Sequence, residues 1–189
     1  LNYILEDGRP PRQFSVPATP DTLPDMDMRE YIDQGVWIIS TIYTYLSYTD
    51  DYSILDEVCS YYVAHPEHNY VMRKSDIQDS VLEHLLRIMD FLARNLEREY
   101  GTNCLRALYG DWNDALDGLG KTKDPGKKYG SGVTVMATLQ FYQNLQEMTK
   151  ILTKIGKYTE KISEYAAYSK GIEEGLKKYG IDVNDAGQR

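Results

Sequence analysis

The chain has 189 residues, of which 42% are hydrophobic and 26% charged, and this balance predicts one folded domain that buries about two-thirds of its unfolded surface. Its net charge of -8 at pH 7 argues against nucleic acid as a partner, because nucleic-acid binders present a basic face to the phosphates. The sequence has no apolar run long enough to span a membrane and no signal pattern at its N-terminus, so we expect a soluble protein without a membrane partner.

The first 30 residues are expected to form an extended lead-in, because their prolines fix φ and remove backbone donors. These prolines are Pro10, Pro11, Pro17, Pro20 and Pro24. The chain begins with Leu1 and has no obvious stop at either end, so we expect it to be a segment of a longer protein.

Five helices are expected after the lead-in, because apolar residues recur there at steps of three and four. The first is apolar nearly all round and should be deeply buried, and no segment shows the sustained alternation of a strand. The expected helices are 31–48, about 54–63, from Asp76 or Asp79 to about Tyr100, 133–155 and 159–179. The resulting prediction is an all-α fold of helical hairpins arranged as a partial toroid, with residues 31–180 helical and 181–189 a tail.

A glycine-rich stretch from Thr102 to Gly132 interrupts the helices and reads as a long loop, and loops of this length are usually functional or disordered. It contains the turn Gly110-Asp111-Trp112-Asn113-Asp114. Two carboxylates, a carboxamide and an indole suit the hydroxyl groups and the ring face of a sugar. A capped turn with a buried Trp112 explains the same residues equally well.

Asp33 is the second candidate, because it stands at the mouth of the first helix, four residues before Trp37. Partial burial there would favour the protonated carboxyl that a general acid needs. A helix cap or a first-turn carboxylate favoured by the helix dipole is the competing interpretation, and from the residues alone it is the stronger one.

The remaining reactive residues give weaker signals. Cys59 and Cys104 have no second ligand at metal spacing, which indicates reduced thiols, a cytoplasmic location, and neither a metal nor another cofactor. A run of lysines in the loop could attract phosphate, although a solvated loop is the simpler explanation. The run comprises Lys121, Lys123, Lys127 and Lys128.

Taken in order, these blocks resemble glycoside hydrolase family 94, the cellobiose and chitobiose phosphorylases formerly classed as glycosyltransferase family 36. The resemblance covers about residues 25–150. It rests on the turn from Gly110 to Asp114, on Ile32-Asp33-Gln34-Gly35-Val36-Trp37 followed by Tyr45-Leu46-Ser47-Tyr48-Thr49-Asp50, and on Ile54-Leu55-Asp56-Glu57. It implies an (α/α)6 barrel, of which residues 31–180 would be part of the catalytic domain.

The resemblance also implies the chemistry. Asp33 falls on the family's general acid, and Trp37, Asp111, Trp112, Asn113 and Asp114 would bind the sugar. Inorganic phosphate would be the co-substrate in an inverting phosphorolysis of a β-glucoside in carbohydrate metabolism. The sequence departs from the family at Gln34, which replaces a second Asp, and at Ser131, which replaces a Glu.

Two alternatives stay open at this point. An inverting hydrolase would use water, with Asp111 or Asp114 as the base. A non-catalytic scaffold or carbohydrate-binding fragment would need neither acid nor phosphate. The isolated segment is expected to be inactive, and a homodimer of the full-length enzyme is left open.

Overall fold

The computed structural model describes residues 1–17, 19, 22–65, 68–113, 117–180 and 187. The chain divides into two compact units, Leu1–Phe91 and Leu92–Arg189. The helix α2 (Val81–Arg94) begins in the first unit and ends in the second.

The first unit contains α1 (Gln34–Thr49), which ends where Asp50 adopts a left-handed conformation with φ 52°. The Asp50 N–H donates to the Leu46 carbonyl at 2.9 Å, as expected for a helix C-terminus. A short 3-10 helix, η1 (Tyr52–Asp56), follows, and the Asp51 side chain caps it by accepting from the Ser53 N–H. The helix expected over about 54–63 is therefore wrong beyond its first turn.

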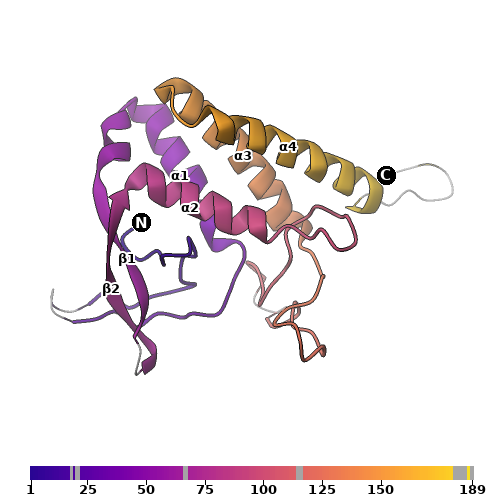
Figure 1. Cartoon of the computed structure of the whole chain (residues 1–189), viewed down its shortest axis with the longest axis horizontal. Coiled ribbons are helices and arrows are strands. Elements are labelled where there is room, and N and C mark those ends of the chain that lie inside the picture. The colour runs from indigo at the N-terminus through magenta and orange to yellow at the C-terminus, as the bar shows by residue number, and fades with distance from the viewer. Residues whose placement is uncertain (18, 20–21, 66–67, 114–116, 181–186, 188–189) are drawn as a thin grey trace. The chain divides into compact units, whose positions relative to one another are not determined.

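In its place stands a two-stranded antiparallel sheet of β1 (Val58–His65) and β2 (His68–Ser80), seen as a long hairpin in Figure 1. The prediction of an all-α fold, and with it the partial (α/α)6 barrel or helical-hairpin toroid, is wrong, because the described residues combine four α-helices with this sheet. The physical reason lies in β1. Neighbouring Tyr61 and Tyr62 are both buried, so the apolar-polar alternation that identifies a strand is absent.

The first residues of the chain pack along the same sheet. The Tyr62 N–H donates to the Ile4 carbonyl at 2.9 Å, and the Glu6 N–H donates to the Tyr62 carbonyl at 3.3 Å. Leu5, Met26, Tyr62 and Met72 then form a buried apolar cluster. The lead-in thus has backbone hydrogen bonds and a core contact of its own.

The second unit contains the end of α2 at Arg94, six residues before the expected end at Tyr100. The helix stops there because the next backbone groups pair elsewhere: the Arg106 N–H donates to the Asn95 carbonyl at 3.0 Å, and Leu96 pairs with Leu105. Residues 95–106 therefore form a tight loop directly after the helix.

A helical hairpin forms the rest of the second unit, with α3 (Val135–Ile155) and α4 (Thr159–Gly175) lying side by side in Figure 1. Thr134 caps α3, and Gly156 ends it with a φ of 67°. The Tyr142 hydroxyl, early in α3, donates to Glu173 late in α4 at 2.5 Å, so the two helices run antiparallel. A π-helical turn, η3 (Leu176–Gly180), follows.

Candidate functional site

Asp33 lies directly before α1 and is 2% exposed. Its side chain makes no capping hydrogen bond to the helix, so the capping interpretation does not explain it. Instead, the Trp37 indole Nε1–H donates to Asp33 Oδ2 at 3.2 Å, and the Gln34 amide donates to Oδ1 at the same distance. The spacing of four residues places the indole one helical turn above the carboxyl group.

Trp37 is itself 50% exposed, so the indole covers Asp33 on one side and meets solvent on the other. The helix beneath is half-buried, contrary to the expectation of a deeply buried α1. Val36, Ile39 and Leu46 are buried, whereas Tyr45 is exposed. A buried carboxyl group beside an accessible aromatic ring is therefore the geometry found at the start of α1.

The turn holds its first carboxylate with two hydrogen bonds. Asp111 Oδ1 accepts from the Asn113 N–H at 3.0 Å, and Oδ2 accepts from the Thr134 hydroxyl at 2.6 Å. Trp112 is 62% exposed, so the expected alternative of a buried tryptophan is wrong. Asp114 lies outside the described residues.

The turn belongs to a long loop that is closed at its base. Arg106 pairs with Val133 in an antiparallel bridge, and the Ala107 N–H donates to the Gly132 carbonyl at 2.8 Å. Higher in the loop, a Cβ at position 120 would lie 1.8 Å from the Leu108 carbonyl oxygen, so only glycine fits there. These backbone contacts hold the turn in place.

Glu97 organises the neighbouring loop from inside and is almost fully buried. Its carboxylate accepts from the Tyr100 N–H at 2.7 Å, and from the Thr102 N–H at 3.1 Å and hydroxyl at 2.9 Å. Burial alone would raise the pKa of Glu97, but these hydrogen bonds outweigh it and lower the pKa below its usual value. Glu97 was not expected from the sequence as a loop-forming residue, because it matched the polar face of a continuing helix.

The lysine run is spread over the loop surface. Lys127 pairs with Glu99 at 2.9 Å, while Lys121 lies over the Tyr109 ring at 4.9 Å and Lys128 over the Tyr129 ring at 5.4 Å. These contacts support the interpretation as a solvated loop.

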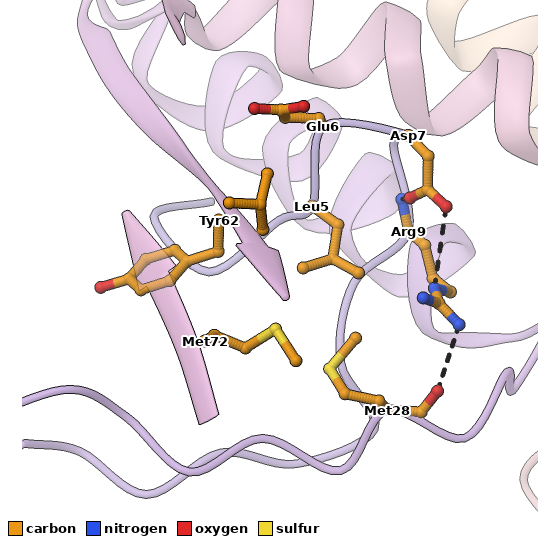
Figure 2. A pocket seen from close by; sticks show the side chains of 8 residues that line it. Leu5, Glu6, Asp7, Arg9, Met28, Tyr62 and Met72 are labelled. Atoms are coloured by element: carbon orange, nitrogen blue, oxygen red, sulfur yellow. Dashed lines mark hydrogen bonds and ion pairs between the residues drawn. The ribbon is translucent and has the colours of Figure 1, made fainter. Parts of the chain in front are cut away.

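A cavity of about 280 Å³ lies in the first unit, beside the apolar cluster. It is lined by Leu5, Glu6, Asp7, Arg9, Met28, Tyr62, Val63 and Met72. Figure 2 shows Arg9 between Asp7 and the Met28 carbonyl, to which Arg9 Nη1 donates at 3.1 Å. Arg9 also pairs with Glu30 at 3.0 Å. Because its charged groups bind one another, we assign this cavity to packing of the N-terminal segment.

Two kinds of feature are absent from the described residues. Within those ranges, no three side chains of His, Cys, Asp or Glu gather closely enough to hold a metal ion. None of the helices in the described part of the chain has both the length and the apolar character needed to cross a membrane.

Residues 13–188 match the family model described as "Glycosyl hydrolase 94 superfamily, catalytic domain". The chain is 26% identical over 196 aligned residues to solabiose phosphorylase from Paenibacillus borealis, covering 100% of this chain and 22% of the relative. It is 25% identical over 153 residues to N,N'-diacetylchitobiose phosphorylase from Vibrio furnissii, covering 80% of this chain and 16% of that protein.

The chain therefore belongs to the glycosyl hydrolase 94 superfamily, and the expected family is confirmed. It spans about a fifth of the length of these relatives. Within the family match, the structure brings Asp33 and Trp37 together in the first unit, and Asp111 and Asn113 together in the second.

Proposed function

We propose that this chain is part of an inverting glycoside phosphorylase that cleaves a β-glucoside with inorganic phosphate. The observation that carries the proposal is the buried Asp33 carboxyl group under the Trp37 indole, within the region that matches the family. The names of both relatives, a solabiose and an N,N'-diacetylchitobiose phosphorylase, support the same reaction class. A saccharide and phosphate are then the two substrates.

In this mechanism Asp33 is the general acid. Its proton passes to the glycosidic oxygen as the bond to the anomeric carbon breaks, and phosphate attacks that carbon from the opposite face. The product is a sugar 1-phosphate of inverted configuration. Phosphate is already a nucleophile at neutral pH, so a second catalytic carboxylate is unnecessary.

The donors around Asp33 fit this role. A carboxyl oxygen that accepts one hydrogen bond can still carry a proton. The indole Nε1–H and the Gln34 amide therefore orient the Asp33 carboxyl group, which can still carry the acid proton. The exposed face of Trp37 offers a ring on which a sugar can stack.

The turn supplies binding groups in this proposal. Asp111, Asn113 and Asp114 bind sugar hydroxyls, while the exposed Trp112 ring packs on the sugar face.

The test is Asp33→Asn in the full-length enzyme, with sugar 1-phosphate release measured as phosphate is varied. We expect activity to fall by about a thousandfold or more, because Asn cannot donate the acid proton. Asp50→Asn is the matched control, since Asp50 lies at the other end of α1, is exposed, and has a left-handed conformation that Asn tolerates. Near-normal phosphorolysis by the Asp33 variant would overturn the assignment.

Calorimetry with glucose, cellobiose and phosphate, together with an assay for free glucose, distinguishes a phosphorylase from a hydrolase and from a non-catalytic scaffold. A phosphorylase binds both a sugar and phosphate, a hydrolase binds the sugar and releases free glucose without phosphate, and a scaffold binds none of them.

A further inference from the structure

We propose that Thr134 is a positioning residue that fixes Asp111 as an acceptor of sugar hydroxyls. This inference rests on the proposed function and deepens it. It joins two segments that are separated by 23 positions and that the sequence alone did not connect.

Thr134 uses its hydroxyl group twice. It donates to Asp111 Oδ2 at 2.6 Å and accepts from the Ala137 N–H at 3.4 Å at the start of α3. The carboxylate is thereby tied to the N-terminus of a 21-residue helix, whose dipole favours negative charge.

The backbone of Thr134 is held as firmly as its side chain. Its N–H donates to the Leu105 carbonyl at 3.0 Å, and its carbonyl accepts from the Thr138 hydroxyl at 2.6 Å. The Thr138 hydroxyl in turn accepts from the Leu105 N–H at 2.9 Å. These bonds close a ring of buried contacts, so the donor that faces Asp111 has a defined position.

These hydrogen bonds leave Asp111 able to accept further hydrogen bonds. A carboxylate has about four acceptor positions, and the Asn113 N–H and the Thr134 hydroxyl occupy one on each oxygen. One position on each oxygen remains for a sugar hydroxyl.

Variants at this position separate positioning from helix capping. Thr134→Ser keeps both the cap and the donor. Thr134→Gly has no hydrogen to donate and adds no charge beside Asp111, and Gly is tolerated at an N-cap about as well as Thr, whereas Thr134→Val loses both the donor and the cap. Thr149→Val is the control, because the Thr149 hydroxyl also bonds to the backbone of α3, at 2.7 Å from the Leu145 carbonyl, but does not touch the turn.

The measurement is the KM for sugar, the KM for phosphate and the kcat of the full-length enzyme. For the Gly and Val variants we expect the sugar KM to rise about tenfold, with little change in kcat or in the phosphate KM, because a hydrogen bond to a charged group is lost. The Ser and control variants should match the wild type. A wild-type sugar KM for Thr134→Gly would overturn the positioning role and leave only the cap.

If the Gly variant does not fold, Thr134→Val carries the test, since Val also lacks the donor. A wild-type enzyme without phosphate-dependent activity would overturn the proposed function itself. An active wild type with an unchanged sugar KM in the donor-free variant would overturn the positioning role alone.

Discussion

Two ionisable groups in each unit are held in different ways. In the first unit, an aromatic ring lies against each of them: Asp33 lies under the Trp37 indole, and His84 stacks on Tyr61 with ring centres 3.9 Å apart. In the second unit, backbone N–H groups and threonine hydroxyls bind two carboxylates. Glu97 is held by Tyr100 and Thr102, and Asp111 by Asn113 and Thr134.

This difference shows how each group is controlled. A group enclosed by rings depends on burial, which disfavours its charged form. A carboxylate held by backbone donors depends on loop geometry, which favours its charged form. His84, whose pKa is lowered by burial, and Glu97, whose pKa is lowered by hydrogen bonds to its carboxylate, are one example of each.

Among the variants that test this comparison, the largest expected effect comes from removing the indole donor with Trp37→Phe, which keeps an aromatic ring. We expect kcat to fall on the order of a hundredfold, because a misplaced catalytic group costs about that much. The sugar KM should change less, since the ring remains. Steady-state kinetics of the full-length enzyme would measure both, with Trp112→Phe for comparison. An equal loss of kcat in the two variants would show that the effect does not come from the hydrogen bond to Asp33.

The next effect concerns a carboxylate of the second unit. Glu97→Gln should destabilise the chain by about 2 kcal/mol at pH 7, because backbone donors lose a charged acceptor and meet an amide N–H. The folded-state pKa of Glu97 lies below its ordinary 4.5, so this stabilisation is present above pH 4.5 and disappears as the pH falls below it. The difference in the free energy of unfolding between the wild type and Glu97→Gln should therefore shrink as the pH falls below 4.5.

Urea unfolding at a series of pH values measures this difference. Glu99→Gln is the control, because the Glu99 side chain forms an exposed pair with Lys127, and such pairs contribute about 0–1 kcal/mol. A pH-independent gap between Glu97→Gln and the wild type would contradict the proposed role of the charge.

The smallest effect belongs to His84, which is fully buried and bonded through Nδ1 to the Ser80 carbonyl at 2.9 Å. Burial lowers the pKa of His84 below 6.5 and outweighs the opposing hydrogen bond and the nearby Asp79. The stability linked to the neutral ring is present above pH 6.5 and is lost as the pH falls. In His84→Phe, the free energy of unfolding should decline less from pH 7.5 to pH 5. An unchanged decline would rule out His84 as its source.

Much of the helical structure was predictable. The expected start of α4 at Thr159 and the expected end of α3 at Ile155 are confirmed, because apolar spacing and Gly156 mark both. The sheet was not predictable in the same way. Tyr61 and Tyr62 are buried on both faces of β1, which removes the alternation, and the register with β2 is a non-local property.

The candidate site likewise has one contact that a local sequence pattern predicts and one that it does not. The contact of Asp33 with Trp37 follows from a spacing of four residues on a helix, and a single sequence suffices to suggest it. Thr134 was missed, because its bond to Asp111 depends on how the loop closes. The backbone bridge between Arg106 and Val133 brings the two segments together, and no local pattern reveals such a bridge.

The contact between Gly120 and the Leu108 carbonyl divides the long loop into two parts. Leu108 and Gly120 lie backbone against backbone, whereas residues 121–129 form an outer hairpin that begins beyond this contact and is closed by the pairing of Lys121 with Tyr129. We expect changes in the length of the outer hairpin to leave the proposed sugar-binding turn in place. This segment is therefore where related enzymes can diverge, or where an engineer can insert new contacts, without rebuilding the site.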